Sequence, residues 1–370
     1  SDKPRDVRVS VDSSTEGPQI VDDKWELISF PYAPGVAWRG HLNTLFGADE
    51  WVAEPWNAAK QIAERGSNKG PTPGTPIWLN TRTEDITLTG AGLTASASGD
   101  HEIPLSLGWN LVADPYLFPV PVENLVVRPL NGDDVRLTDP SAAAYVAPEL
   151  WLPNVTPNKK NAVTKATTLE PWLGYWIHAK QPVTLLVEPF REPETPPATA
   201  PQRPVIQWQG SVALESVSSV ESIDLALADT ARWGEDILDA QGPPTRADIR
   251  LELLQDGDPY HTLALPTEGA EWLWEGRLSA VDGSIMQLRD APMEGWRLYV
   301  ERMDDGMRYE MHVGQELPVA EGERNVRFRL TQRKLGRDVM DVVPTATRLL
   351  PNYPNPFNPE TWVPFTLSHD

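Results

Sequence analysis

Histidine is the side chain best suited to acid–base and metal chemistry near neutral pH, and this sequence scatters its histidines widely. They are His41, His101, His178, His261, His312 and His369. No two stand four residues apart, the spacing with which one helix face presents two imidazoles to zinc. None accompanies a serine or cysteine nucleophile motif, and His178 is expected at a surface or a strand edge. The sequence therefore predicts no metal centre, no cofactor and no local catalytic motif; a triad assembled from distant segments stays open.

Three acidic segments could collect a cation: Asp133-Asp134, Asp256-Gly257-Asp258 and Asp304-Asp305-Gly306. Calcium takes about six to eight oxygen ligands, and none of these segments brings the further ligands of a calcium loop. Ordinary hairpin turns are expected at all three. Paired carboxylates for glycoside hydrolysis must face one another across a cleft, and among 53 acidic residues no pair stands out.

Gly90-x-Gly92, followed by Ala95, has the form of a dinucleotide fingerprint after a strand. A dinucleotide site needs a helix directly after the glycines, because the helix N-terminus holds the pyrophosphate. Residues 94–99 are Thr-Ala-Ser-Ala-Ser-Gly and carry no amphipathic helical pattern. A plain turn is therefore expected here.

The chain has 15 tryptophans, whose rings could stack on sugars or fill a core. Trp51 and Trp151 stand in loop-like surroundings and are the candidates for glycan contact. Two more in such surroundings, Trp38 and Trp56, are expected to be exposed as well. Tryptophans at strand positions are expected in the core. These are Trp25, Trp78, Trp109 and Trp176.

The sequence contains an internal duplication, which determines where these residues are placed. Residues 108–116 repeat residues 25–32, with Trp, Leu, Pro and Tyr in matching places. Residues 171–177 likewise repeat residues 73–79, and a short strand-like run follows each. Two paired signatures in the same order indicate duplicated modules, predicted at residues 24–107 and 108–190.

The 37 prolines disfavour long helices and favour short strands and turns. We expect an all-β protein built of tandem β-sandwich-like modules joined by Pro-rich linkers. Minor short helices are expected within residues 41–65, broken at Pro55 and closed by Gly66. Beyond the duplication the predicted segments are, in order, a Pro-rich linker at 191–204, a β-sandwich at 205–333, a connector at 334–348 and a single strand region at 349–370. Residues 1–23 are expected to be a leader, a linker or an edge strand.

The net charge of −21 excludes nucleic acid and anionic lipid as natural partners. No apolar run reaches the length of about 18 residues that a membrane-spanning helix needs. The chain lacks cysteine, which is compatible with an oxidising exterior. It begins at Ser1 without a signal-like apolar stretch, so we expect a processed or excised piece of a longer protein.

Residues 352–359, Asn-Tyr-Pro-Asn-Pro-Phe-Asn-Pro, resemble the opening of the C-terminal sorting domain of the type IX secretion system. That domain is related to the immunoglobulin-like domain of the flagellar hook-capping protein, and residues 361–367 fit its first strand. The resemblance covers residues 349–370 only. It implies interaction through the side chains of this tail, namely Asn352, Tyr353, Pro356, Phe357, Trp362, Phe365 and Leu367.

The runs Gly-Trp-Asn-Leu at 108–111 and Gly-Tyr-Trp-Ile at 174–177 are similar to modules found upstream of such sorting domains. Together the resemblances imply an extracellular or cell-surface bacterial protein, partnered by other surface subunits, by itself or by a secretion machinery. We expect a non-enzymatic structural or adhesive protein that polymerises by C-terminal strand addition. The alternatives are carbohydrate-binding modules of a secreted hydrolase, which would have glycans as partners, and a hydrolase with a dispersed site.

Overall fold

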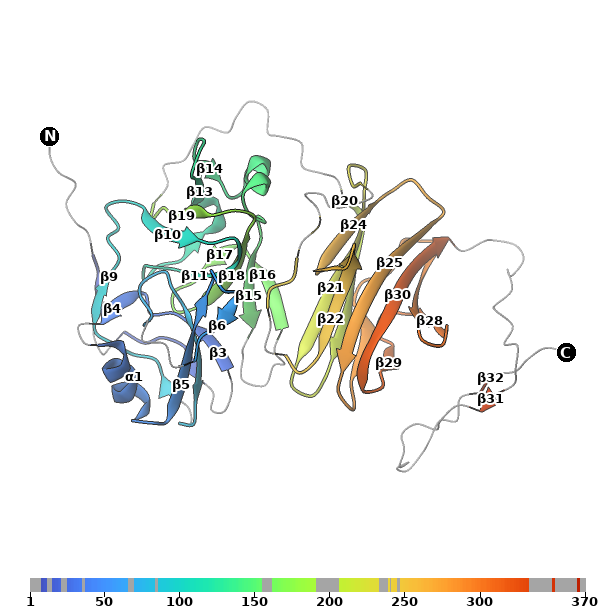
Figure 1. Cartoon of the computed structure of the whole chain (residues 1–370), viewed down its shortest axis with the longest axis horizontal. Helices are drawn as coiled ribbons and strands as arrows, with labels where there is room; N and C mark the ends of the chain where they lie inside the picture. Colours follow the sequence, from blue (N-terminus) through green and yellow to red (C-terminus); the bar gives the residue numbers. More distant parts are fainter. Residues whose placement is uncertain are drawn as a thin grey trace. The chain divides into compact units, whose positions relative to one another are not determined.

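The computed structural model is that of an all-β protein with one α-helix, α1 (Trp38–Phe46), among the residues it describes (Figure 1). The described residues are 8–11, 15–20, 25–34, 37–65, 70–83, 86–154, 162–190, 206–232, 239, 241–244, 247–332, 348–349 and 365–366. Contacts divide the chain into two compact units, Ser1–Thr331 and Gln332–Asp370.

Two four-stranded sheets of the first unit have the same strand order. The earlier sheet runs β3-β7-β5-β6, with strands β3 (Trp25–Ile28), β7 (Ile77–Thr81), β5 (Trp51–Asn57) and β6 (Ile62–Ala63). The later sheet runs β11-β18-β15-β16, with strands β11 (Gly108–Ala113), β18 (Gly174–Ala179), β15 (Leu150–Asn154) and β16 (Ala162–Ala166). The duplication in the sequence is thus a duplication of strand order.

The strand register repeats as well. Leu27 lies opposite Trp78 on β3 and β7, and Leu111 lies opposite Trp176 on β11 and β18. Since a one-residue slip would turn every side chain to the other face, the shared register gives both sheets the same inward-facing tryptophan.

Each of these sheets is accompanied by further short strands. In the later half they form a second sheet of order β10-β19-β13-β14, with β10 (His101–Leu105), β19 (Val183–Val187), β13 (Leu125–Pro129) and β14 (Val135–Arg136). In the earlier half β2 (Gln19–Ile20) pairs with β8 (Ile86–Thr87) in the manner of β10 with β19. We therefore call residues 15–94 the first copy and residues 101–190 the second copy.

Smaller elements complete this region. One sheet runs β1-β9-β4, with β1 (Ser10–Val11), β9 (Gly92–Thr94) and β4 (Tyr32–Pro34). A further pair joins β12 (Val120–Pro121) to β17 (Thr168–Leu169), and two 3₁₀ helices are η1 (Val122–Asn124) and η2 (Pro140–Ala144).

The helical expectation for residues 41–65 is half right. Helix α1 buries Leu42 and Phe46 and ends at Gly47, which has φ of 95°. The rest is wrong, because residues 51–57 form strand β5, paired along its length with β7. The apolar residues there have near-helical spacing, but pairing with a neighbouring strand decides their conformation. Pro55 stands near the end of β5, where the loss of an N–H donor is tolerated.

The third module contains two sheets around one core. Its five-stranded sheet runs β24-β21-β20-β26-β29, with β24 (Thr262–Pro266), β21 (Val220–Ala228), β20 (Ile206–Glu215), β26 (Ile285–Leu288) and β29 (Glu316–Pro318). Its six-stranded sheet runs β23-β22-β25-β30-β27-β28, with β23 (Asp258–Tyr260), β22 (Arg250–Gln255), β25 (Glu271–Ala280), β30 (Gly322–Gln332), β27 (Trp296–Arg302) and β28 (Arg308–Met311). On β25, Trp272 and Trp274 are buried and Glu271, Leu273 and Glu275 are exposed, as the alternation predicts.

In the second unit, β31 (Arg348–Leu349) pairs antiparallel with β32 (Phe365–Thr366). The strand expected at residues 361–367 is described only at these two β32 residues. The other predicted tail residues lie outside the described part of the chain: Asn352, Tyr353, Pro356, Phe357, Trp362 and Leu367. So does the expected linker at 191–204.

Candidate binding site at the seam between the copies

A tryptophan-rich cluster joins the two equivalent four-stranded sheets. Its buried members come from both copies: Leu27, Trp78, Trp109, Leu111, Trp151 and Trp176, with Trp25 and Trp56 partly buried beside them. The Trp56 indole N–H donates to the main-chain oxygen of Trp109 at 2.7 Å. Its ring stands edge-on to Trp176, with centroids 4.8 Å apart and planes at 90°. The core role predicted for Trp78, Trp109 and Trp176 is confirmed.

The exposure predicted for Trp151 is wrong. Trp151 lies on β15 opposite Trp176, is 1% exposed and places its ring 4.5 Å from that of His261. The prolines and asparagines around it resemble a loop, but they flank a strand paired on both sides. Trp51 is half-buried at the start of β5, and its indole N–H donates to Asn43 Oδ1 at 2.9 Å.

His178, expected at a surface or a strand edge, is half-buried and does not lie at an edge. It lies on β18, which stands between β11 and β15 rather than at the sheet edge, and its ring is 5.0 Å from that of Trp109. Burial lowers the pKa of His178, and the nearby Lys180 charge lowers it further. The imidazole is thus a neutral packing group at pH 7.

The copies are linked by reciprocal hydrogen bonds at equivalent positions. The Ser29 N–H after β3 donates to the Trp172 oxygen at 2.7 Å, and the Ala113 N–H at the end of β11 donates to the Gly74 oxygen at 3.0 Å. Gly74 and Trp172 occupy matching places in the duplicated sequence, and both have left-handed backbones, with φ of 83° and 70°. Glycine adopts this conformation freely, whereas for tryptophan it is strained.

The strain at Trp172 is compensated by the place of its ring. Trp172 belongs to the second copy, but its side chain is 5% exposed in the core of the first, with ring centroids 6.1 Å from Phe30 and 5.7 Å from Tyr32. In return, His101 and Ile103 of the second copy approach Gly74 of the first. Each copy therefore completes part of the other.

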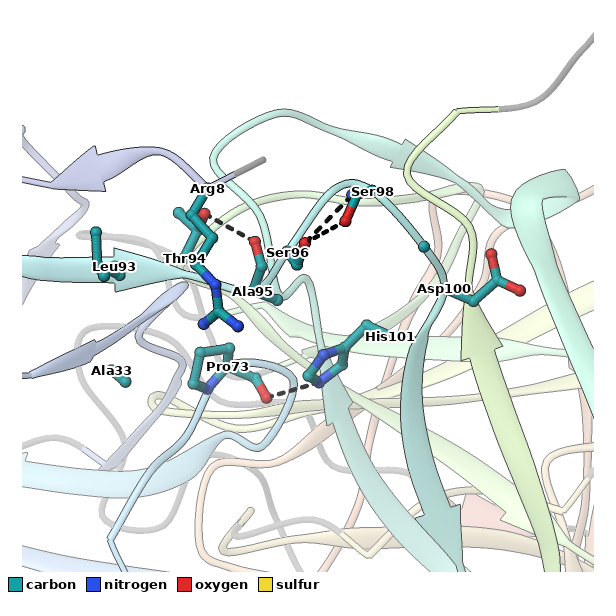
Figure 2. A pocket seen from close by; sticks show the side chains of 11 residues that line it. Arg8, Ala33, Pro73, Leu93, Thr94, Ala95, Ser96, Ser98, Asp100 and His101 are labelled. Carbon is teal, nitrogen blue, oxygen red and sulfur yellow. Dashed lines mark hydrogen bonds between the residues drawn. The ribbon is translucent and has the colours of Figure 1, made fainter. Parts of the chain in front are cut away.

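A hollow of about 440 Å³ opens at this seam, where the chain passes from the first copy to the second. Figure 2 shows Arg8, Pro73 and His101 around it, with Ser96 and Ser98 on the segment that connects β9 to β10. We call this the seam hollow. Its volume lies within the range of about 300–1,000 Å³ that is typical of small-molecule sites.

The polar side chains of the seam hollow are the Ser96 and Ser98 hydroxyls, the His101 imidazole, the Arg8 guanidinium and the Asp100 carboxyl. Ser96 Oγ and Ser98 Oγ lie 2.7 Å apart, and His101 Nε2 lies 3.1 Å from the Pro73 oxygen (Figure 2). Burial lowers the pKa of His101, so the ring is neutral at pH 7. Since a carbonyl oxygen only accepts, Nε2 carries the hydrogen and Nδ1 is left as an acceptor.

Asp100 adds a carboxyl group at the rim. Its pKa is raised first by burial and then by the charge of Glu188, while Arg128 and Arg136 act in the opposite direction. These cations belong to a mixed network in which Arg128 pairs with Glu102 at 2.9 Å and with Asp134 at 3.1 Å. The surroundings of the hollow therefore carry both signs of charge.

A stack of three aromatic rings stands beside the seam hollow. Tyr116 and Phe118 lie 5.1 Å apart with planes at 4°, and Phe118 and Phe190 lie 5.2 Å apart with planes at 15°. Tyr116 is 1% exposed and Phe190 is 71% exposed, so the stack leads from the core to the surface. The Tyr116 hydroxyl lies 3.2 Å from the Val187 oxygen and 3.4 Å from that of Gly99, a residue that lines the hollow.

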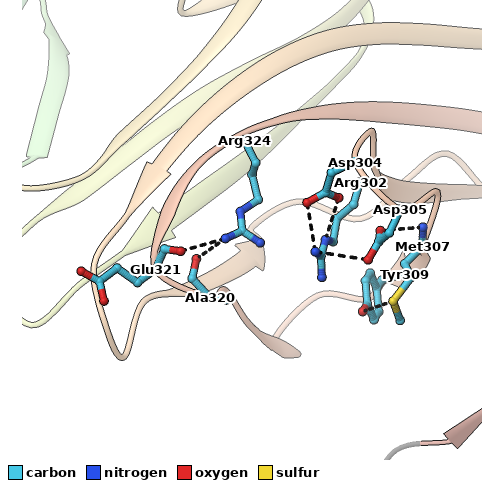
Figure 3. Close-up of polar contacts among 8 residues, drawn as sticks. All are labelled: Arg302, Asp304, Asp305, Met307, Tyr309, Ala320, Glu321 and Arg324. Carbon is cyan, nitrogen blue, oxygen red and sulfur yellow. Dashed lines mark hydrogen bonds and ion pairs between the residues drawn. The ribbon is translucent and has the colours of Figure 1, made fainter. Parts of the chain in front are cut away.

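Two of the three acidic segments contain turns, and Asp133-Asp134 lies in the connection between β13 and β14. Asp304 and Asp305 both pair with Arg302, at 3.1 and 3.2 Å, between β27 and β28 (Figure 3). Asp256 and Gly257 have φ of 53° and 93° between β22 and β23, as in a tight hairpin turn. Among the residues that the structure describes, no group of three His, Cys, Asp or Glu side chains could hold a metal ion.

Gly90 and Gly92 serve packing. A Cβ at Gly90 would lie 1.5 Å from the Tyr32 hydroxyl, and one at Gly92 would lie 2.2 Å from the Ala33 oxygen. Gly92 begins strand β9, so the segment is a strand entry rather than the plain turn expected, and no helix follows it.

Sequence reasoning missed the seam hollow and the ring stack. Ser96, Ser98, His101 and Phe190 belong to no motif, and only the duplication hints at a junction near residue 100. Comparison with protein-family models, curated proteins and solved structures finds no match. Within the described ranges, the structure contains no helix with the length and apolar character needed to cross a membrane.

Proposed function

We propose that this chain is a non-enzymatic structural or adhesive protein of a bacterial cell exterior, and that it assembles through its C-terminal tail. The observation that carries the proposal is the reciprocal joining of the two copies through Ser29, Trp172, Ala113 and Gly74. Two small β modules that complete one another's cores form a stiffer body than two modules on a flexible linker. Stiff tandem β bodies suit scaffolding and attachment.

The outer face of the third module supports this role. Glu301 is 8% exposed and lies between Arg308, at 2.8 Å, and Arg329, at 2.7 Å. Arg329 also pairs with Glu271 at 2.7 Å, and Arg327 pairs with Glu275 at 3.0 Å. Paired charges along this face leave it without the large apolar patch that marks a protein–protein interaction site. Assembly would then proceed through a dedicated segment instead of through this face.

The tail at residues 349–370 is that segment, on the strength of its resemblance to the start of a secretion sorting domain. An extended strand that adds to a neighbouring sheet uses main-chain hydrogen bonds for affinity and side-chain pockets for specificity. In the described part of the tail, Phe365–Thr366 pairs with Arg348–Leu349, so this segment is extended, as strand addition requires.

Deletion of residues 352–370 tests the proposal by size-exclusion chromatography with light scattering and by electron microscopy. We expect oligomers of the full chain to be lost while the melting temperature of the Ser1–Thr331 unit is unchanged. A matched pair of variants refines the result: Trp362→Ala should weaken assembly, and Glu360→Ala should not. A full chain that stays monomeric at high concentration, or a deletion that assembles normally, contradicts the proposal.

A further inference from the structure

The aromatic stack ends in an open, fixed plane. Phe190 is 71% exposed, although one side of its ring packs in parallel on Phe118, which packs in turn on the buried Tyr116. A ring supported from behind by two parallel rings loses little freedom when a ligand covers its open side. Such a plane suits the apolar face of a ring-shaped ligand.

The aromatic stack and the seam hollow lie at the same end of the β10–β19 pair. His101, the first residue of β10, lies opposite Val187, the last residue of β19. Asp100 precedes β10 and Phe190 follows β19, so both lie at the same end of this strand pair. The Tyr116 hydroxyl contacts the main-chain oxygens of both Val187 and Gly99, which ties the base of the stack to the wall of the hollow.

The polar groups of the seam hollow complement alcohols. Ser96 and Ser98 hydroxyls both donate and accept, and His101 Nδ1 accepts. Asp100 also lines the hollow, with its carboxyl group directed away from Ser96 and His101 (Figure 2). A sugar ring has the matching character, since its C–H face is apolar and its edge carries hydroxyls that donate and accept.

We propose that the seam hollow and the Phe190 plane form a binding site for a neutral saccharide. One sugar ring stacks on Phe190, and the hydroxyls of a further ring of the same saccharide bond to Ser96, Ser98 and His101. The chain's net charge of −21 disfavours anionic polysaccharides, and the hollow itself holds one cationic and one acidic side chain, Arg8 and Asp100, so we expect a neutral ligand. The site shares no residue with the C-terminal tail, so it goes beyond the assembly function and does not depend on it.

The tryptophans suggested by the sequence are less suitable. Trp151 is 1% exposed and cannot be reached by a ligand. Trp51 faces Trp38 with ring planes tilted by 58°, and its indole N–H is engaged by Asn43, so the pair presents no flat platform. Substitution of Trp51 by alanine serves as a second control in the test below.

The test is binding of the full chain to a printed array of neutral glycans, followed by isothermal titration calorimetry with cellohexaose, xylohexaose and mannohexaose. We expect saturable binding to at least one neutral oligosaccharide and none to oligogalacturonate. Phe190→Ala and the double variant Ser96→Ala/Ser98→Ala should each weaken binding about tenfold, the loss of about 1.4 kcal/mol that one stacking or hydrogen-bonding group supplies.

Leu130→Ala is the matched control, because Leu130 is also an exposed apolar side chain, 81% exposed, beyond the far end of β13. It and Trp51→Ala should bind as the unaltered chain does. Absence of binding to every neutral glycan overturns the proposal. So does binding that Phe190→Ala leaves unchanged, or a preference for oligogalacturonate. Equal melting temperatures of Phe190→Ala and Leu130→Ala exclude misfolding as the cause of a loss.

Discussion

A Cβ added to Gly17 would lie 2.7 Å from the indole ring of Trp172, although the two residues belong to different copies. Gly17 N–H also donates to the Leu88 oxygen at 2.6 Å, which holds the backbone in place against the ring. The seam between the copies is therefore packed as closely as a protein interior.

Gly17→Ala should destabilise the chain by about 1–3 kcal/mol, because neither the buried ring nor the hydrogen-bonded backbone can move aside. The measurement is urea denaturation followed by tryptophan fluorescence. Gly40→Ala is the control: it lies in α1 with nothing within 4 Å of the new Cβ, and should raise stability by about 0.5–1 kcal/mol. Equal effects of the two changes would show that the seam is loose.

Asp114→Asn should change how stability depends on pH. Asp114 is 0% exposed, and burial, with a smaller contribution from Glu170, raises its pKa from 3.8 to about 8. Between these values the unfolded chain has lost a proton that the folded chain keeps, so the free energy of unfolding falls by about 1.4 kcal/mol per pH unit as the pH rises. The asparagine variant lacks this slope.

Denaturation of both proteins at pH 5, 6, 7 and 8 measures the difference. The amide oxygen of the new asparagine can accept the hydrogen bond that Tyr116 N–H gives to Asp114 at 2.7 Å, so the fold should be kept. The variant should become the more stable protein toward pH 8. Parallel pH profiles would mean that Asp114 is already ionised in the folded state.

His261→Gln should reduce sensitivity to acid. Burial, assisted by the Lys165 charge, lowers the pKa of His261 from 6.5 to about 3 in the contact with Trp151. Below pH 6.5 the unfolded chain takes up a proton that the folded chain does not bind, so stability falls by about 1.4 kcal/mol per unit as the pH falls toward 3. The nearest acidic group is Asp224, whose Oδ2 lies 4.0 Å from His261 Nδ1; its charge does not offset the effect of burial on the pKa of His261.

The measurement is the free energy of unfolding of the unaltered chain and of the variant at pH 7 and at pH 5. The difference between the two proteins should change by about 2 kcal/mol in favour of the glutamine variant at pH 5. His312→Gln is the matched control, because the His312 side chain is 64% exposed. If the difference in free energy of unfolding between the two proteins does not change with pH, water reaches His261 in the folded protein.

Glu301→Gln should destabilise the third module by about 1–3 kcal/mol, because it leaves two guanidinium groups beside a buried neutral amide. Glu275→Gln removes one half of an exposed pair, with a side chain 65% exposed, and should cost about 0.5 kcal/mol or less. Thermal unfolding at low and at high salt distinguishes them, since salt should weaken only the contribution of the exposed pair.

The all-β class and the alternation on β25 could be predicted because proline content and period-two burial are local properties of the sequence. The core positions of Trp78, Trp109 and Trp176 could be predicted for the same reason. The prediction for Trp151 is wrong because its neighbours resemble a loop, and only pairing with distant Trp176 makes it a buried strand residue. The seam hollow could not be predicted, because its lining residues, among them Pro73, Ser96 and His101, are brought together by packing between the two copies.

The position of Trp172 has a consequence for synthesis. The first copy emerges from the ribosome long before Trp172 does, so its aromatic core stays incomplete while most of the second copy is being made. The hydrogen-bond acceptor for Ser29 arrives at the same moment as that ring. The first copy therefore cannot reach its final packing as an independent module. Its core is completed only after Trp172 of the second copy has been synthesised.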